Sequence, residues 1–254
     1  MYMDNKNYKE RIESNRELMK SAFTEKGHKS DQQKQLPQPP LAKQSVNENK
    51  IALTKDFSGI IKESNILTII NERKSHRVFK KESITLEQLS FLLWATQGVK
   101  GIRGDNYATE RTVPSGGARH PFEVYIAVIN VEGLEKGIYH YLPLSHELEL
   151  IRLLDNVENA VVESLDNQKW TGKSAAVFYY TAIPYRSEWR YTISAHKLVL
   201  LDAGHAAQNL YIGCGAIGCG TCAAADYNQE LADKLLQVDG KDEFVVYTAP
   251  VGVI

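Results

Sequence analysis

Two short segments of this 254-residue chain carry side chains that could bind an anionic ligand. The first is Arg73-Lys74-Ser75-His76-Arg77, which gathers four potentially cationic groups and a hydroxyl. Alternate side chains of an extended backbone lie on one side, so Arg73, Ser75 and Arg77 would face the same way. Guanidinium groups and a hydroxyl are suited to bind a phosphate and another electron-rich edge. A solvated basic turn accounts for these residues equally well, and both interpretations stay open.

The second segment, Arg111–Arg119, reads Arg-Thr-Val-Pro-Ser-Gly-Gly-Ala-Arg and precedes an apolar run. Adjacent glycines let a backbone approach a flat ligand closely, and the proline before them stiffens the entry to the turn. A plain loop would need neither the arginines at both ends nor the serine beside the glycines. Together the two segments predict a site for a phosphorylated, planar cofactor, which the residue types alone do not identify.

Two other patterns imitate known sites. Gly213–Gly218 has the spacing G-x-G-x-x-G, but the dinucleotide-binding turn follows a strand and opens a helix, whereas here a predicted helix comes first. Cys214, Cys219 and Cys222 have the spacing of an iron–sulfur loop, which needs a fourth cysteine that this chain lacks. We therefore interpret the cysteines as buried thiols, and no metal site is predicted.

The two segments lie among predicted helices and strands. Thr85-Leu-Glu-Gln88 has the form of a capping box and predicts a helix that ends at Gly98. Gly137–Leu142 and Glu147–Leu153 flank a proline-containing turn and predict a hairpin. Because a hairpin makes the sheet at least partly antiparallel, we expect an α+β fold rather than a doubly wound one. The other predicted elements are helices over 64–72, 194–212 and 228–236 and strands over 122–129, 175–183 and 243–251.

The first 50 residues differ in composition from the rest. They are poor in apolar residues, and prolines cluster at positions 37, 39 and 40. We predict an N-terminal helix followed by an extended, polar, proline-containing arm. Such an arm buries too little apolar surface to fold alone, so it either lies on the main domain or stays mobile. The predicted division is an arm over 1–50 and one compact domain over 51–254.

Composition argues against several classes of protein. A net charge of −1 gives no general electrostatic reason to bind nucleic acid or an anionic membrane. Three cysteines make no disulfide framework, and the first 20 residues hold no apolar run of a signal peptide, so we expect a cytoplasmic protein. Ala203–Ala225 contains no Asp, Glu, Lys or Arg and is about as long as a membrane span. Its five glycines favour a protein interior or subunit interface over a membrane.

The order of these motifs resembles the FMN-dependent nitroreductase superfamily. The segment Arg73-x-Ser-x-Arg77-x-Phe79, followed by a helix that ends Leu-Leu-Trp-Ala-Thr-Gln-Gly98, is similar to the opening of that family. The run Arg111–Tyr125 resembles its SagB-type dehydrogenase branch. The strand at 137–141, the helix at 201–209 and the ending at 247–252 fit the same branch. The motifs keep a consistent order from about residue 64 to residue 252.

The resemblance implies an α+β fold with a central, mainly antiparallel sheet flanked by helices, in an intertwined homodimer with two FMN sites at the subunit interface. Arg73 and Ser75 would hold the FMN phosphate, and Arg77 would favour the charge that develops at the pyrimidine end as the flavin accepts hydride. The apolar helix through Ala206 and Ala207 would pack in the dimer core. The cofactor-binding residues expected are Arg73, Lys74, Ser75, Arg77, Arg111, Pro114, Ser115, Gly116, Gly117, Cys222, Ala223 and Ala224.

Within this set, Pro114–Gly117 would line the isoalloxazine edge, and Cys222–Ala224 would direct a backbone N–H toward N5. Two features depart from the family pattern. The chain has Val253-Ile254 where members often carry a basic residue that helps to hold the phosphate. Azoline-oxidising members use a Lys-Tyr pair, and at Trp189-Arg190-Tyr191 the lysine is an arginine, which does not readily lose a proton. A peptide azoline oxidase is therefore not the first hypothesis, and no catalytic side chain is assigned.

The hypothesis is an FMN-dependent oxidoreductase that works by ping-pong hydride transfer from NAD(P)H to a small organic acceptor, nitroaromatic or quinone-like. The partners expected are a second copy of the chain, NAD(P)H and the acceptor, with neither nucleic acid nor membrane. Two alternatives stay open. One is a SagB-type flavin dehydrogenase or oxidase that acts on a heterocycle of a peptide or natural product. The other is a low-turnover flavin-binding or sensing protein whose arm recruits a partner.

Overall fold

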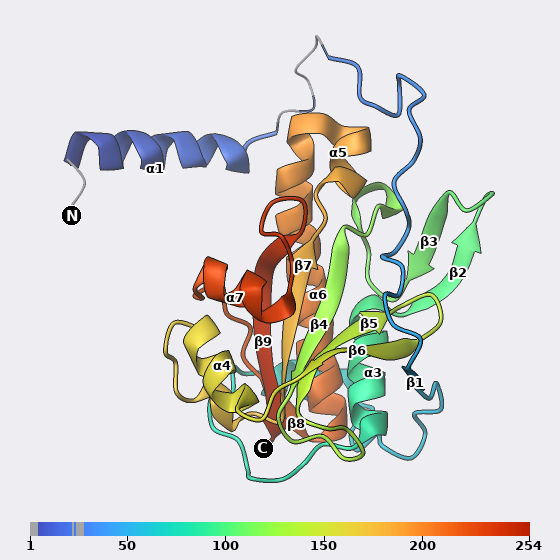
Figure 1. The fold of residues 1–254 in the computed structure, drawn as a ribbon, viewed down its shortest axis with the longest axis vertical. Helices are drawn as coiled ribbons and strands as arrows, with labels where there is room; N and C mark the ends of the chain where they lie inside the picture. The colour runs from blue at the N-terminus through green and yellow to red at the C-terminus, as the bar shows by residue number, and fades with distance from the viewer. Residues whose placement is uncertain (1–4, 22, 24–27) are drawn as a thin grey trace.

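The main sheet has seven strands, and every ladder between neighbouring strands is antiparallel (Figure 1). The computed structural model describes residues 5–21, 23 and 28–254, so residues 1–4, 22 and 24–27 of the predicted arm lie outside the described residues. The strand order is β1 (Lys50–Ala52), β6 (Glu147–Leu153), β5 (Gly137–Leu142), β4 (Phe122–Val128), β7 (Ala176–Ala182), β9 (Phe244–Val253) and β8 (Cys219–Thr221). The predicted α+β class with a central antiparallel sheet is confirmed.

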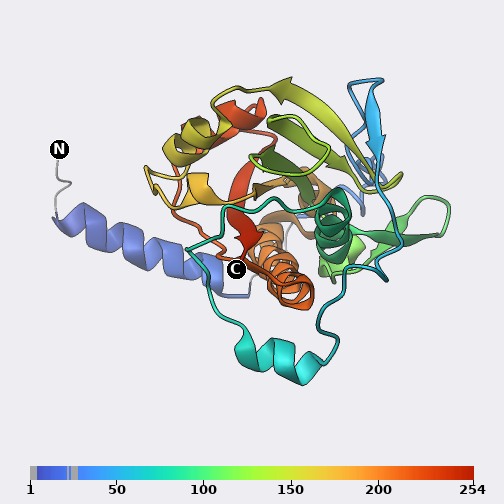
Figure 2. The same ribbon diagram turned by 90° about the horizontal axis from the view of Figure 1, so that it is seen from below.

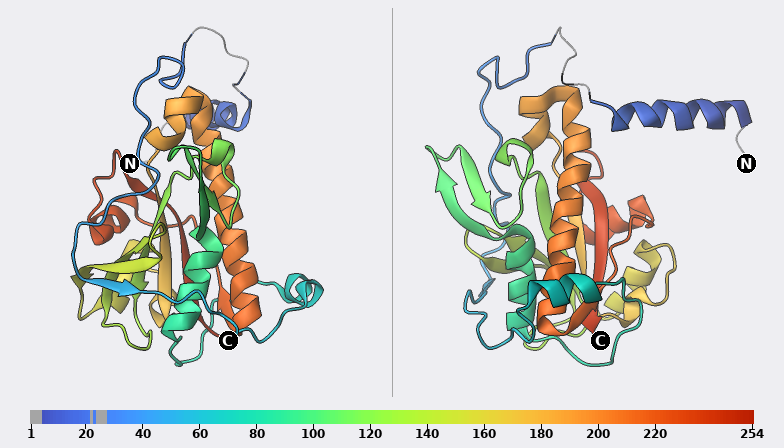
Figure 3. Two further views of the ribbon diagram at one scale, coloured as in Figure 1. Left: turned by 90° about the vertical axis from the view of Figure 1, so that its right-hand side faces the viewer. Right: turned by 180° about the vertical axis from the view of Figure 1, so that it is seen from behind.

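Helices cover both faces of this sheet, which explains why the central strands are apolar throughout (Figures 1 and 3). On one face lie α3 (Leu86–Gln97) and the long α6 (Ala195–Ile217), packed on Val124 and Ile126 of β4. On the other lie α4 (Val157–Ser164) and α7 (Gln229–Leu236), packed on Tyr125 and Ala127. Successive residues of a strand point to opposite faces, so β4 supplies side chains to both cores.

The local signals for helix ends are confirmed at α3. Thr85 caps the helix, and both bonds of its capping box with Gln88 are formed. The helix α2 (Ile66–Glu72) begins two residues later than predicted, at a cap formed by the Asn65 side chain. The helix α6 extends five residues past its predicted end and stops at Gly218, whose φ of 74° is left-handed. The glycine motif Gly213–Gly218 is therefore a helix end and not a dinucleotide-binding turn.

Several short elements were not predicted. A separate two-stranded hairpin joins β2 (Val99–Arg103) to β3 (Ala108–Arg111). The helix α5 (Tyr185–Tyr191) lies directly before α6 in the chain, and three 3-10 turns cover 116–118, 171–173 and 192–194. These elements have few apolar positions of clear period, so the sequence pattern gave little indication of them.

The N-terminal region has two parts. The helix α1 (Asn5–Met19) extends away from the domain (Figures 1 and 2). From residue 28 the chain runs over α5 and the β2–β3 hairpin, and Gln32 N donates to Trp189 O at 2.8 Å while Trp189 Nε1 donates to Leu36 O at 3.1 Å. Lys43 N then donates to the buried carboxylate of Glu123 at 2.8 Å. These bonds join the arm to the sheet of its own chain.

The two faces of α6 differ in what they contact. Ala206 and Ala207 are buried within this chain, and Ala206 belongs to the core that α6 forms with the sheet. That the helix through them also packs in a dimer core stays a prediction. The exposed side of the helix carries other small or apolar residues, among them Leu200, Leu201 and Gly204. Within the described residues, no helix combines the length and the apolar character needed to cross a membrane.

Candidate functional site

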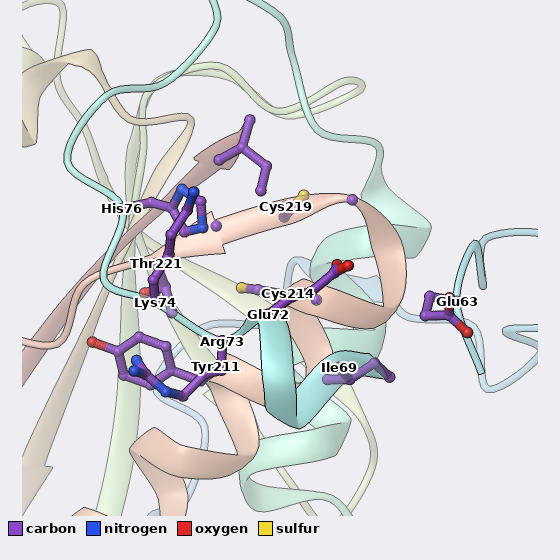
Figure 4. A pocket seen from close by; sticks show the side chains of 14 residues that line it. Glu63, Ile69, Glu72, Arg73, Lys74, His76, Tyr211, Cys214, Cys219 and Thr221 are labelled. Carbon is purple, nitrogen blue, oxygen red and sulfur yellow. The ribbon is translucent and has the colours of Figure 1, made fainter. Parts of the chain in front are cut away.

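Tyr211, near the C-terminal end of α6, joins the segments 73–75 and 222–224. Figure 4 shows its ring beside Arg73. Its hydroxyl lies 3.0 Å from Ser75 Oγ and accepts a hydrogen bond from the backbone N–H of Ala223, also at 3.0 Å. The guanidinium of Arg73 lies over the Tyr211 ring, 5.4 Å from its centroid. The fold therefore brings 73–75 and 222–224 together across about 150 residues of sequence.

Tyr211 and Arg73 line a cavity of about 440 Å³, and Ser75 and Ala223 lie next to it through their contacts with Tyr211. Its wall comes from α2, the segment after it, the end of α6 and β8, and the side chains are drawn in Figure 4. The lining residues are Glu63, Ile69, Glu72, Arg73, Lys74, His76, Tyr211, Cys214, Gly215, Gly218, Cys219, Gly220, Thr221 and Ile254. The volume lies within the range of about 300–1,000 Å³ that is usual for small-molecule sites.

The segment 73–80 is held in place along one edge of the sheet. His76 N donates to Thr221 O at 2.9 Å, and Lys80 N donates to Val253 O at 2.9 Å. Gly220 allows this close approach, because a Cβ there would lie 2.7 Å from the His76 ring and 2.5 Å from Ile254. The backbone bonds fix which way the side chains of this segment point.

The expected grouping of three side chains is only partly formed. Arg73 and Ser75 both contact Tyr211. Arg77 lies instead over the Trp170 ring, 6.0 Å from its centroid, and lines a different cleft. Lys74 lines the cavity beside Arg73. The cationic cluster at the cavity is therefore Arg73 and Lys74, without Arg77.

The three backbone N–H groups of 222–224 differ in their partners. Ala224 N donates to Thr248 O at 2.8 Å within a β-bridge, and Cys222 N donates to Pro250 O at 3.4 Å. Only Ala223 N donates to a side chain, the Tyr211 hydroxyl. A side-chain hydroxyl can rotate away, whereas the backbone carbonyls are held in the sheet. Among these three groups, the Ala223 N–H is the one that a ligand could take over at least cost.

The thiols of the cavity wall are poor nucleophiles. Burial raises the pKa of Cys219 to about 11, and the pKa of fully buried Cys214 is raised well above its ordinary value, also by burial. Both groups therefore stay protonated near neutral pH. All three cysteines are buried and free, as predicted.

The glycine-containing loop 114–117 lies against the other half of α6. Gly116 N donates to both carboxylate oxygens of Asp202 at 3.2 Å, and His120 N donates to Ser115 Oγ at 2.9 Å. Burial raises the pKa of Asp202, and hydrogen bonds from Ser115 and Gly116 oppose this rise. Gly117 has a φ of 60°, and a Cβ there would lie 2.3 Å from the Tyr191 hydroxyl. The loop is thus fixed between α5 and α6, with Tyr191 against its second glycine.

Arg111 is placed away from both the cavity and the loop surface. Its guanidinium is buried and donates to Gln97 Oε1 at 2.8 Å, Leu41 O at 3.0 Å and Thr109 Oγ1 at 3.1 Å. Burial lowers its pKa to about 10, so it remains charged at neutral pH. In this chain Arg111 connects β3 to α3 and to the N-terminal arm.

The two halves of the predicted site are separated along α6. Asp202, which holds the loop 114–117, and Tyr211, which holds Ser75 and Ala223, are nine residues apart on that helix. At 1.5 Å per residue this is a spacing of about 13 Å along the axis. Neither Asp202 nor Tyr211 was predicted from sequence, because one acid or tyrosine in an apolar helix has no distinguishing pattern. Their roles depend on what the folded helix packs against.

Comparison with known proteins supplies a family match over most of the chain. Residues 70–253 match the model of the nitroreductase family. A nitroreductase from Methanocaldococcus jannaschii is 30% identical over 193 residues, which is 76% of this chain and 92% of that protein. The microcin B17-processing protein McbC of Escherichia coli is 27% identical over 210 residues, 79% of this chain and 75% of that protein.

Solved structures agree with the fold. The crystal structure of a nitroreductase from Ralstonia eutropha has a TM-score of 0.66 and 25% sequence identity, and the match covers 86% of this chain and 94% of that one. A nitroreductase from Desulfovibrio desulfuricans, solved in complex with FMN, has a TM-score of 0.52 and 15% identity over 75% of this chain and 86% of that chain.

Proposed function

The chain belongs to the nitroreductase family of oxidoreductases, and from that premise we propose that it uses FMN to pass a hydride from NAD(P)H to a small organic acceptor. One observation supports this most directly. The Tyr211 hydroxyl joins Ser75 to the backbone of Ala223 beside a cavity of about 440 Å³. These are the segments that the family pattern assigns to the flavin phosphate and to the edge of the flavin ring.

Arg73, Lys74 and Ser75 are the groups that would hold the FMN phosphate. Guanidinium, ammonium and hydroxyl donors match phosphate oxygens, and the charged ones give the strongest hydrogen bonds. Within the described part of the chain, neither Arg73 nor Lys74 forms an ion pair with a carboxylate, so both are available to an anion. Lys74 lines the cavity and would take the part of the basic residue that relatives carry after the last strand.

The backbone N–H of Ala223 is the donor that would reach flavin N5. Its present partner is the Tyr211 hydroxyl, which lies between Ser75 and Ala223 and would move aside. Because one hydroxyl reaches both Ser75 Oγ and the Ala223 N–H, a polar edge of a ligand could bind both of them in its place. The Desulfovibrio relative was solved with FMN, which supports the same cofactor here.

When bound, FMN supplies the hydride chemistry, and the protein supplies binding, orientation and charge. Arg73 and Lys74 would offset the charge of the phosphate. The Ala223 N–H would lie at the ring edge where electron density changes during the reaction. Ile69 and Cys214 form an apolar part of the wall that excludes water. No side chain is assigned as an acid or base.

The exposed face of α6 would contact a second copy of the chain. Leu200 and Leu201 are 53% and 52% exposed, and Gly204 leaves open space beside the helix. In a twofold dimer with two antiparallel α6 helices, the Asp202 end of one helix lies near the Tyr211 end of the other. Each flavin site would then combine the cavity of one chain with the loop 114–117 of its partner.

A second candidate is a SagB-type dehydrogenase that oxidises a heterocycle of a peptide or natural product. The similarity to the microcin B17-processing protein favours it. Arg190 stands where a lysine is expected, and its guanidinium donates to the Tyr107 hydroxyl at 2.7 Å. An arginine held in this way is a poor base, so the reductase remains the preferred function.

The test is the visible absorption spectrum of the purified protein, reconstituted with FMN and recorded before and after anaerobic addition of NADH or NADPH. Bleaching of the flavin bands, followed by recovery with a quinone or nitroaromatic compound, is the expected result. A bound flavin that neither nicotinamide reduces would favour the dehydrogenase or a flavin sensor. A protein that does not bind FMN would exclude all three.

A further inference from the structure

A second cleft, of about 830 Å³, lies beside the segment that follows the candidate site in the chain. Residues 77–82 form one wall, and the turn over 170–174 forms another. The residues that matter for its chemistry are Arg77, Lys81, Lys136, Glu158, Trp170 and Lys173. We name it the Trp170 cleft. It shares no lining residue with the cavity beside Tyr211.

The indole of Trp170 is held in place by the turn that carries it. Trp170 Nε1 donates to Gln168 Oε1 at 3.1 Å, and the next residue, Thr171, is buried and donates to Gln168 O at 2.7 Å. Gly172 brings the turn against α4, because a Cβ there would lie 2.9 Å from Glu158 O. The indole is thus a fixed aromatic surface in the wall of the cleft.

Arg77 and Phe79 face this indole without packing tightly on it. The Arg77 Cζ atom is 6.0 Å from the ring centroid, at the outer limit of a cation–π contact. The Phe79 ring centroid is 6.4 Å away with an interplanar angle of 38°. A planar ring stacks at about 3.5 Å from each neighbour, so a ring between the guanidinium and the indole needs a separation of about 7 Å. A small outward rotation of the exposed Arg77 side chain would open that space.

The charged groups of the cleft are mostly positive. Five cationic side chains line it, at positions 77, 80, 81, 136 and 173, against the two acids Glu82 and Glu158. Lys136 forms an ion pair with Glu158, and Lys80 donates to Ile254 O at 2.7 Å. Within the described residues, Lys81 and Lys173 form no ion pair, and both are exposed. The cleft therefore offers unneutralised positive charge next to an aromatic surface.

We propose that the Trp170 cleft binds a nucleotide, with its base stacked between Trp170 and Arg77 and its phosphates on Lys81 and Lys173. An aromatic surface next to cationic groups binds a base by stacking and a phosphate by charge. The nucleotide is either a free mononucleotide or the adenylate part of a dinucleotide. This site is separate from the proposed flavin site and does not depend on it.

The test measures the binding of ADP to the full chain by equilibrium dialysis, with and without saturating FMN. We expect one ADP per chain, with the same affinity in both cases. Trp170→Leu weakens binding by about tenfold or more, and Lys173→Gln by about threefold to tenfold, because stacking and a phosphate contact are lost. Lys241→Gln, an exposed lysine in the turn before β9, is the charge-matched control and leaves the affinity unchanged.

Glu158→Gln provides a variant with the opposite sign. It removes an acid from the cleft and releases Lys136, so ADP binding tightens by about threefold. A merely structural role of Glu158 would not increase the affinity. NADP⁺ competes with ADP if the natural ligand is a dinucleotide and does not compete if it is a mononucleotide. Absence of ADP binding, displacement of ADP by FMN, or unchanged affinity in both Trp170→Leu and Glu158→Gln would overturn the proposal.

Discussion

The backbone N–H of Ala223 donates to the side-chain hydroxyl of Tyr211 at 3.0 Å. The tyrosine lies on α6 and the alanine on the segment that follows β8, so this bond connects the end of the long helix to the edge of the main sheet. The same hydroxyl lies 3.0 Å from Ser75 Oγ. The proposed ring-edge donor is therefore occupied by a group that a ligand can displace, and this has a measurable consequence.

Tyr211→Phe removes that hydroxyl and leaves the ring. The variant should lose about 1 kcal/mol of folding stability, the usual net value of a hydrogen bond, while its affinity for FMN stays the same or increases. The reason is that FMN no longer has to displace the hydroxyl from Ala223. Chemical denaturation and fluorescence titration with FMN measure the two quantities.

Tyr227→Phe is the matched control for that variant. Its hydroxyl donates to Val245 O at 2.9 Å, far from the cavity lining, so the loss of stability is similar and FMN affinity does not change. If Tyr211→Phe folded normally but bound FMN more than tenfold more weakly, Tyr211 would be a ligand of the flavin and not a displaced group.

Arg73→Gln should weaken FMN binding by about 10- to 100-fold, since a hydrogen bond to a charged group contributes about 1.5–3 kcal/mol. The affinity of the parent should fall as salt increases, and that of the variant should fall less, because one cation fewer faces the phosphate. Arg16→Gln, on the exposed α1, serves as the control. Equal affinities of the parent and Arg73→Gln would contradict the assignment of the phosphate to this segment.

The elements that could be predicted from sequence are those with local signals. The capping box at Thr85 and the hairpin Gly137–Leu153 depend on neighbouring residues, and both are found at the expected positions. The end of α6 depends on other elements. Gly213 and Gly215 read as helix breakers, yet they lie inside the helix, where a Cβ would come within 3.1 Å of Leu92 and Ile69. These glycines allow α3 and α2 to pack closely on α6, which a local pattern does not reveal.

The site shows the same division. The residue types in 73–77 left an anion-binding cluster and a solvated basic turn both open, and in the structure Arg73 and Ser75 both contact Tyr211, with Arg73 lining the cavity. Arg77 does not join them, because the side chain lies over Trp170, about 90 residues away in sequence. That the predicted residues hold FMN stays a prediction, which the variants of Arg73, Gly117 and Ala223 test for the phosphate segment, the loop and the ring-edge donor.

Leu201→Glu places a charge on the exposed face of α6, in the middle of the proposed dimer contact. We expect sedimentation velocity to show a shift from dimer to monomer, because a buried, unpaired carboxylate is costly. FMN binding should fall with it. Leu153→Glu, at a residue of β6 with a similar exposed fraction of 50%, is the control and should keep the dimer. If Leu201→Glu remained a dimer, the dimer interface would not be this face of α6.

His140 should make the stability of the fold depend on pH. It is buried between Glu123 and Glu149, at 2.9 Å and 2.8 Å. Burial opposes its protonation, but the two carboxylates outweigh that effect and raise its pKa to about 8. The stabilisation is therefore full below pH 6.5 and is lost as the pH rises through 8. From the size of this shift, the loss amounts to about 2 kcal/mol.

Thermal melts between pH 6 and 9 measure this dependence. The parent should lose stability between pH 7 and 9, and His140→Gln should be less stable at pH 6.5 and should lack that loss. The difference between the two curves isolates His140, because the lowered pKa values of His76, His120 and His146 affect both proteins alike below pH 7. His28→Gln, at an exposed position, should melt like the parent at every pH. A difference between the parent and His140→Gln that stays constant between pH 6.5 and 8.5 would mean that His140 does not carry a second proton in the folded chain.

The separation of Asp202 and Tyr211 along α6 leads to a complementation experiment on the flavin site. Arg73→Gln disables the cavity, and Gly117→Leu disables the loop, because a side chain at φ 60° would collide with Tyr191. If each site combines a cavity and a loop from different chains, a heterodimer of the two variants holds one intact site and one doubly altered site. If each site lies within one chain, the heterodimer holds none.

Co-expression of the two variants decides between these arrangements. Random pairing makes half of the dimers heterodimers with one intact site of two, so about a quarter of the parental NAD(P)H oxidation should return. The control pairs Arg73→Gln with Ala223→Pro, which removes the N–H that donates to Tyr211 in the same half of the site, and should restore nothing. If activity returns only when Arg73→Gln is paired with Gly117→Leu, the loop 114–117 of one chain serves the cavity of the other. If activity returns in neither mixture, the whole site lies in a single chain.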